Sequence, residues 1–245
     1  MPMQIYESPR EAARACGTRI LEVLEESLRG GAASATLAVS GGSTPKLMFD
    51  AMAEASGFDW KRVHLFWVDE RVVPPGDEQS NYRLAKESLI DRVHIPARNV
   101  HRVFGELEPD AAAKRYREEL RDYFELGRDG VPSFDVIHCG MGPDAHTASL
   151  FPEDPLTEDR RGLAASVFAP KLPHWRVTLL PAVLLQAKNT LMLVTGADKA
   201  DTLHEVVHGE YDGYKRPVQI LQREGRNVAW YLDRAAAAKI ATTAA

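Results

Sequence analysis

Residues 140–152, GMGPDAHTASLFP, form the stretch on which the predicted fold and function depend. They follow residues 134–139, FDVIHC, a short apolar run that predicts a buried strand. Gly140 and Gly142 favour a tight turn at the end of that strand. Residues 145–150 have a helical pattern. The stretch therefore predicts a strand, a turn and a helix in sequence.

Asp144 and His146 give this turn its chemical interest, because ligands bind at the carboxyl ends of strands in open α/β sheets. The turn has three interpretations. It is an ordinary glycine-rich turn with a capping aspartate, a dinucleotide-binding G-x-G-x-x-A motif, or a catalytic loop with His146 as general base. The second is disfavoured because Asp144 would set a negative charge beside a pyrophosphate. The acids that follow also lie in a polar loop instead of ending a second strand: Glu153, Asp154, Glu158 and Asp159.

Apolar runs and helical patterns alternate along the rest of the chain. Strands are predicted at residues 36–39, 63–68, 163–168, 176–180, 190–194, 219–221 and 228–231, with a further short one within 100–104. Helices are predicted from the capping box at Ser8 to about Arg29, from Thr44, from Ser80 or Asn81 to about Ile90, over 109–126, over 181–186, from about Lys199 to Val207, and after Asp233. This alternation predicts a mostly parallel sheet with helices on both faces.

A second glycine-rich turn, Ser40-Gly41-Gly42-Ser43-Thr44-Pro45, follows the predicted strand 36–39. Thr44 is a natural N-cap and Pro45 a natural first helical residue. Free backbone N–H groups at such a helix start attract anions. The turn lacks the G-x-x-x-x-G-K-[ST] pattern of a Walker loop, and we expect it to bind a phosphate rather than serve only as a tight connection.

Charged residues also follow the strand at 63–68. Asp69, Glu70 and Arg71 stand where ligand-binding groups belong, although three charges after a strand, taken alone, favour a solvated loop.

Composition excludes several classes of function. The 245 residues are 44% hydrophobic and carry a net charge of −5, so no basic surface for nucleic acid is indicated. Cys16 and Cys139 match no metal spacing and predict reduced, buried thiols in a cytoplasmic protein. The first residues have no apolar signal-peptide core, and no run approaches the 18 apolar residues of a membrane span.

His204-Glu205-Val206-Val207-His208 matches H-E-x-x-H, the zinc-binding pattern of many metalloproteases. Gly209 follows at once and favours the end of the helix, and the extended form of the motif is missing. We therefore expect no metal site here.

The chain resembles the 6-phosphogluconolactonase family. The similarity rests on the 40–45 turn, on Asp69-Glu70-Arg71 with Ser80 and Asn81, on residues 140–152, on Arg176-Val177-Thr178-Leu179 and on Gly196-Ala197-Asp198-Lys199-Ala200, all in the family's order. The resemblance implies one domain over residues 1–245 with a Rossmann-like fold similar to glucosamine-6-phosphate deaminase. It also implies hydrolysis of 6-phospho-D-glucono-1,5-lactone to 6-phosphogluconate in the pentose phosphate pathway, without metal or organic cofactor.

The resemblance also leaves questions open. Family members have glycine where this chain has Ala145, which would be strained if the position needs a positive φ. Deaminases of the same fold are the nearest alternative, but they carry a glutamate five residues after the histidine, and Phe151 at that position in this chain favours the lactonase. A non-catalytic sugar-phosphate sensor is the second. No nucleic-acid, membrane or protein partner is expected. The chain is expected to be a monomer or a weak homo-oligomer.

Residue roles follow as expectations. The phosphate would bind Gly41, Gly42, Ser43 and Thr44, and His146 would take a proton from the attacking water. Asp69 or Asp144 would orient the histidine or a basic partner, and the sequence does not choose between them. The basic side chains that could complete the site are Arg71, Lys171, Arg176 and Lys199.

Overall fold

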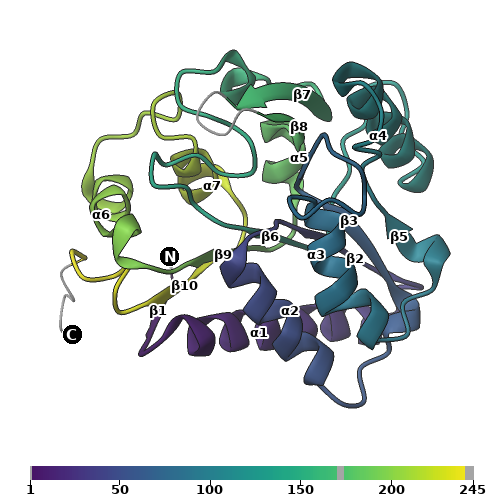
Figure 1. Ribbon diagram of the computed structural model, residues 1–245, viewed down its shortest axis with the longest axis horizontal. Helices are drawn as coiled ribbons and strands as arrows, with labels where there is room; N and C mark the ends of the chain where they lie inside the picture. Colours follow the sequence, from purple (N-terminus) through teal and green to yellow (C-terminus); the bar gives the residue numbers. More distant parts are fainter. Residues whose placement is uncertain (1, 170–173, 241–245) are drawn as a thin grey trace.

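A computed structural model describes residues 2–169 and 174–240, so the candidate Lys171 lies outside the described residues. Its main feature is a seven-stranded sheet in the order β1-β10-β9-β6-β2-β3-β5, in which every neighbouring pair is parallel (Figure 1). The strands are β1 (Met3–Tyr6), β2 (Ala35–Val39), β3 (Val63–Trp67), β5 (Val100–His101), β6 (Val136–Cys139), β9 (Thr190–Val194) and β10 (Val228–Asp233).

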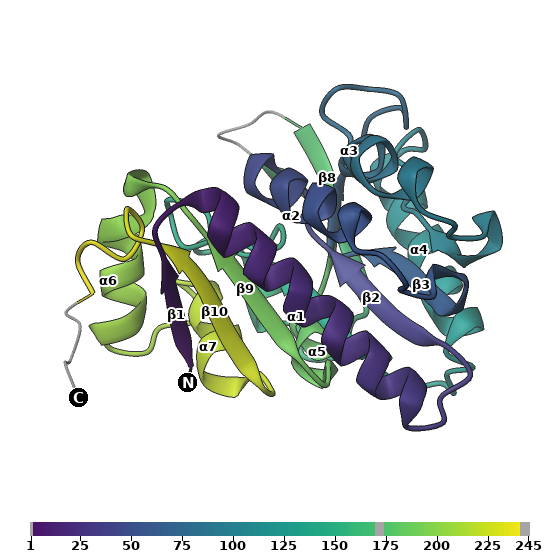
Figure 2. The same cartoon turned by 90° about the horizontal axis from the view of Figure 1, so that it is seen from below.

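Seven α-helices are found within the described ranges. They are α1 (Pro9–Arg29), α2 (Ser43–Glu54), α3 (Asn81–Ser88), α4 (Pro109–Tyr123), α5 (Pro181–Gln186), α6 (Ala200–His208) and α7 (Val218–Glu224). Helices α1 and α2 lie on one side of the main sheet, and α5 and α7 lie on the other (Figure 1). Figure 2 shows α1 running across β10 and β9. The predicted fold, a mostly parallel sheet flanked by helices, is confirmed.

Local sequence explains why these elements form. Strands β2, β6 and β9 are buried along their whole length, which suits the interior of a parallel sheet. Helix α1 begins where the Ser8 side chain accepts a hydrogen bond from the Glu11 amide at 3.3 Å, with Pro9 in the first turn. The predicted start and end of this helix are confirmed.

The order of the strands fixes where a ligand can bind. From β2 the chain moves outward through β3 to β5, then returns to place β6 on the other side of β2. The connections after β2 and β6 therefore leave the sheet in opposite directions, and a crevice opens between the carboxyl ends of these two strands. The 40–45 turn follows β2, and the 140–152 loop follows β6. The two segments singled out in the sequence thus flank this crevice.

A small antiparallel sheet adds a third group of residues. It consists of β4 (Asp69–Arg71), β8 (His174–Leu179) and β7 (Ala164–Ala169), in the order β4-β8-β7. The pairing sets Arg71 opposite Arg176 and Asp69 opposite Thr178. The strands predicted at 163–168 and 176–180 are therefore present, but in this separate sheet.

Four local predictions were wrong. Residues 145–150 form turns instead of a helix, because Ala145 and Ala148 have φ angles of 66° and 52°, which a right-handed helix does not allow. Residues 219–221 belong to helix α7, which Pro217 precedes, and not to a strand. Helix α2 starts at Ser43 after Gly42, one residue before the expected cap Thr44. After β10, residues 234–239 form turns instead of a helix, and the Asp233 carboxylate accepts hydrogen bonds from the amides of Gly196 and Ala236.

None of the helices in the described part of the chain is long and apolar enough to cross a membrane.

Candidate functional site

A cavity of about 240 Å³ lies at the crevice between β2 and β6. Segments that follow β2, β3, β6 and β9 contribute to its wall, together with β8. Larger hollows occur elsewhere, including one of about 750 Å³ beside β1 and β10, but the smaller cavity is the one at the strand ends. Its lining residues are Ser40, Gly41, Asp69, Arg71, Asn81, Gly140, Met141, Gly142, Pro143, His146, Ala148, Arg176 and Lys199.

His146 is held by Asp144 at the edge of this cavity. The Asp144 Oδ1 and His146 Nδ1 atoms are 2.5 Å apart, and both side chains are partly buried. With its proton on Nδ1, the imidazole donates to the carboxylate and leaves the lone pair of Nε2 free to accept another proton. A Cβ atom at position 142 would overlap the imidazole ring, so Gly142 is needed for close approach. The pair has the geometry that an oriented general base requires.

Ala145, between these two residues, is in the left-handed region with φ 66°. The expectation that a positive φ would strain this alanine therefore applies. Two backbone hydrogen bonds hold the loop in place, from the Gly142 amide to the His146 carbonyl at 2.9 Å and from the Val218 amide to the Ala145 carbonyl at 3.0 Å. These two hydrogen bonds, one of them from Val218 in α7, hold Ala145 in its strained conformation.

We expect Ala145→Gly to raise the free energy of unfolding by about 0.5–1 kcal/mol. Glycine adopts this φ without steric cost, and the relief exceeds the extra entropy of the unfolded chain. Urea denaturation would measure the change. The matched control is Ala15→Gly within α1, which should lower stability by roughly the same amount. Equal losses in both variants would contradict the strain at Ala145.

Asp69 faces a different set of partners from Asp144. Its Oδ2 accepts a hydrogen bond from Ser149 Oγ at 2.8 Å and lies 3.6 Å from Arg176 Nη1. The Asp69 and Arg176 side chains are each 7% exposed, so this is a buried ion pair. Of the two aspartates left open by the sequence, Asp144 contacts His146 and Asp69 contacts Arg176.

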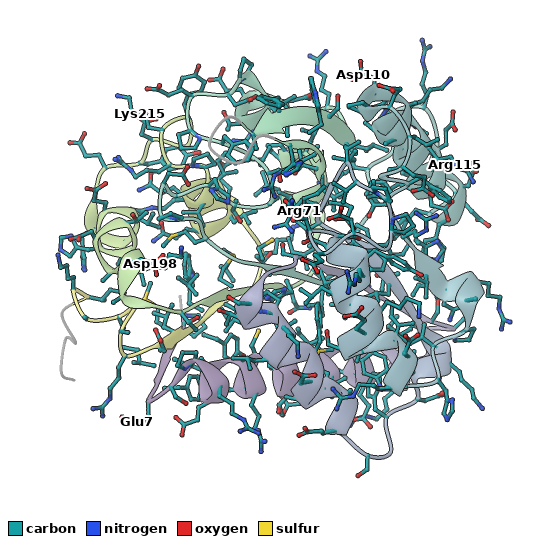
Figure 3. The ribbon with its side chains drawn as sticks, in the orientation of Figure 1. Glu7, Arg71, Asp110, Arg115, Asp198 and Lys215 are labelled. Atoms are coloured by element: carbon teal, nitrogen blue, oxygen red, sulfur yellow. The ribbon has the colours of Figure 1, made fainter. Side chains whose placement is uncertain are left out.

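Positive charge exceeds negative charge around the cavity. Arg71 and Lys199 line it together with Arg176, and Figure 3 shows Arg71 near the centre of the molecule. Arg71 Nη1 donates to the Gln79 carbonyl at 2.5 Å, and Lys199 Nζ lies 2.7 Å from Asp198 Oδ2 at the start of α6. Three cations converging on one small cavity favour an anionic ligand.

The 40–45 turn approaches the cavity only in part. Ser40 and Gly41 line it, whereas Ser43 and Thr44 begin α2, with Gly42 as its N-cap. The Thr44 hydroxyl is 2.7 Å from that of Thr195, which joins this helix start to the segment after β9. The turn therefore presents backbone N–H groups at a helix N-terminus, and its first residues share the cavity with the three cations.

Three residues around the site were given no role from the sequence: Glu70, Asn81 and Ser149. The buried Glu70 carboxylate accepts hydrogen bonds from the amides of Arg71, Asn81 and Tyr82 and from the Ser80 hydroxyl. Burial raises the pKa of Glu70 to about 7, although these hydrogen bonds act in the opposite direction. In the sequence, Asn81 appears only as part of a motif. Its role depends on its contact with Gly41, which no local sequence pattern reveals.

The H-E-x-x-H segment lies away from this cavity. His204 and His208 are exposed on α6 with ring centroids 4.9 Å apart, and α6 ends at Gly209 as predicted. Across residues 2–169 and 174–240, no group of three or more His, Cys, Asp or Glu side chains could hold a metal ion.

Phe151 packs beside His146, with ring centroids 5.1 Å apart. This apolar side chain occupies the position at which a carboxylate would be needed for a second acid–base group next to the imidazole. Among the described residues, the imidazole therefore has Asp144 and not a residue at position 151 as its carboxylate partner.

Comparisons with known proteins agree with this geometry. The sequence model of the family described as glucosamine-6-phosphate isomerases/6-phosphogluconolactonase matches residues 7–230. The 6-phosphogluconolactonase of Haemophilus influenzae is 39% identical over 203 residues, which cover 82% of this chain and 85% of that protein. The structure of the 6-phosphogluconolactonase from Trypanosoma brucei superposes with a TM-score of 0.87 at 28% identity, covering 98% of each chain. A monomeric glucosamine-6-phosphate deaminase superposes with a TM-score of 0.82 at 16% identity, a likeness of fold alone.

Proposed function

The chain belongs to the family of glucosamine-6-phosphate isomerases and 6-phosphogluconolactonases, and we propose that it hydrolyses 6-phospho-D-glucono-1,5-lactone to 6-phosphogluconate. The observation that carries the proposal is the His146–Asp144 pair, 2.5 Å apart, beside a cavity lined by three cations. A sugar-phosphate lactone needs both features, a base for water and positive charge for the phosphate.

The proposed reaction begins at His146 Nε2. Neutral imidazole takes a proton from water as the water oxygen attacks C1 of the lactone, and Asp144 stabilises the imidazolium that forms. Negative charge develops on the former carbonyl oxygen and is stabilised by backbone N–H groups or a cation of the cavity wall. When the C1–O5 bond breaks, the imidazolium returns its proton to O5. The product acid then ionises to 6-phosphogluconate.

The phosphate is proposed to bind the amides of residues 41–44 together with Arg176 and Lys199. Asp69 holds the Arg176 guanidinium by the buried ion pair, so this cation is oriented before the substrate arrives. Arg71 lies on the same wall and is the third candidate. Lys171 remains a candidate outside the described residues.

We expect Lys199→Ala to raise KM by roughly 10- to 100-fold while kcat stays within a few-fold of wild type. A charged hydrogen bond to the phosphate is worth about 1.5–3 kcal/mol and is made equally in the ground state and the transition state. Steady-state kinetics would separate the two constants. Lys114→Ala, a change on the exposed face of α4, is the control. A loss confined to kcat would instead place Lys199 with the chemistry.

Phe151 is the observation that favours the lactonase over a deaminase. Amino-sugar isomerisation requires proton transfers during ring opening, for which a second carboxylate beside the His146–Asp144 pair is useful, and Phe151 offers none. A sugar-phosphate sensor would need the cations but not the oriented base pair.

We further propose that residues 1–245 act as one domain, in the cytoplasm, as a monomer or weak homo-oligomer. The two buried, unpaired cysteines are consistent with a reducing compartment.

The proposal is tested by adding chelator-treated protein to fresh 6-phosphogluconolactone and following acid release above the spontaneous rate. Glucosamine 6-phosphate is assayed in parallel for ammonia release. Fast lactone hydrolysis supports the proposal. Ammonia release without hydrolysis would assign the chain to the deaminases, and binding without either reaction would indicate a sensor.

A further inference from the structure

Gly41 and Gly42 are glycines for different physical reasons. Gly42 has φ 120°, which disfavours any other residue, whereas a Cβ there would meet only Pro45 Cδ at 3.6 Å. Gly41 is not in the left-handed region, but a Cβ at this position would overlap the side-chain amide of Asn81. Position 41 therefore requires glycine because Asn81 occupies the space beside it.

Asn81 is held in that space from two directions. Its backbone amide donates to Glu70 Oε1 at 2.7 Å, and its side-chain Nδ2 donates to the Asp69 carbonyl at 2.8 Å. The second bond sets the orientation of the amide group and leaves Oδ1 directed at Gly41. Asn81 is 2% exposed, and Oδ1 has no hydrogen-bond partner within the described residues. The Asn81 amide oxygen therefore fills the space beside Gly41 and excludes any side chain at position 41.

Glu70 prevents Asn81 from moving away. Its carboxylate is 2% exposed and also accepts the amides of Arg71 and Tyr82, at 2.7 Å each, and the Ser80 hydroxyl at 3.1 Å. These bonds fasten the first turn of α3 to β4. Displacing Asn81 would therefore break several hydrogen bonds to one buried carboxylate, which costs more than losing a single exposed bond.

We propose that Asn81 is a positioning residue for the phosphate-binding turn. Its amide, fixed by Glu70 and Asp69, holds Gly41 so that the N–H groups of residues 41–44 face the cavity. The inference rests on the proposed function, in which those N–H groups bind the phosphate. It also explains why β4 and α3, which follow a different strand from the turn, belong to the site.

A double-mutant cycle tests the proposal with Gly41→Ala, Asn81→Ala and the pair together. The readouts are calorimetric affinity for inorganic phosphate and for 6-phosphogluconate, melting temperature, and KM and kcat. Asn81→Ala should weaken both affinities about 10-fold and raise KM equally, with kcat within about 3-fold of wild type, because only the turn is loosened. Gly41→Ala should weaken binding by about 10²-fold in the wild-type background, because the turn is displaced. In the Asn81→Ala background it should cost less than about 3-fold, because the amide atoms that overlap a Cβ at position 41 are gone and only the Cβ of residue 81, 3.0 Å away, stays close.

Gly42→Ala is the matched control. Its penalty comes from φ and not from Asn81, so it should be the same in both backgrounds. Equal penalties for Gly41→Ala in both backgrounds, or unchanged phosphate affinity in Asn81→Ala, would overturn the proposal. If Gly41→Ala alone does not fold, recovery of folded protein in the double variant supports it and failure there overturns it. Phosphate binding and melting remain informative even if lactone hydrolysis is absent, so the two hypotheses fail separately.

Discussion

His146→Gln is expected to lower kcat by about 10²–10⁴-fold, the usual contribution of a general base. Glutamine retains a polar side chain of similar size but cannot take a proton from water. The Asp144 contact at 2.5 Å is the reason to expect this effect, since it favours the Nδ1–H tautomer and leaves Nε2 as the acceptor. The measurement is the initial rate of acid release from saturating lactone, corrected for spontaneous hydrolysis.

Affinity for 6-phosphogluconate should stay within a few-fold of wild type in this variant, because the phosphate is proposed to bind elsewhere in the cavity. His94→Gln, at an exposed position outside the cavity, is the control for the substitution itself. A near wild-type kcat in His146→Gln would remove His146 from the mechanism. An equal loss of product affinity would indicate instead that the loop had collapsed.

The sequence predicted those parts of the site that are local. Asp144 and His146 are two residues apart in a turn after a strand, so their contact needs only the conformation of that turn. The 40–45 turn was likewise recognised from a strand, two glycines and a helix start. The topology that brings the two loops together followed from the alternation of strands and helices, because parallel strands end at the same edge.

The contacts that were not predicted depend on pairing between distant segments. Asp69 meets Arg176 because β4 pairs with β8, more than a hundred positions along the chain, and no local pattern sets that register. Asn81 meets Gly41 for a similar reason, through the attachment of α3 to β4. From the sequence, either Asp69 or Asp144 could have been the partner of His146. The pairing of β4 with β8 decides the matter, because it places Asp69 beside Arg176.

The mistaken helix at residues 145–150 has a related cause. Its side chains have a pattern that a helix would accept, but the chain must turn twice to bring His146 back to the cavity. Positive φ angles at Ala145 and Ala148 make those turns, and contacts with α7 and with Thr178 stabilise them. Local propensity was overridden by tertiary contacts, as expected at a functional site.

The largest effect expected on stability concerns His138 in β6, which the proposed mechanism does not use. This histidine is fully buried, and neither ring nitrogen has a hydrogen-bond partner within the described ranges. Burial lowers the pKa of His138 to about 3. On acidification below pH 6.5 the unfolded chain therefore takes up a proton that the native protein does not, and stability falls as the pH drops towards 3.

Each pH unit in that window costs about 1.4 kcal/mol, so His138 should lower the free energy of unfolding by roughly 2 kcal/mol between pH 7 and pH 5. His138→Leu should remove this part of the pH dependence, as measured by urea unfolding at the two pH values. Burial of Glu70, with its raised pKa, acts in the opposite direction in both proteins, so the difference between them isolates His138. An identical slope in His138→Leu and wild type would show that His138 is not held neutral.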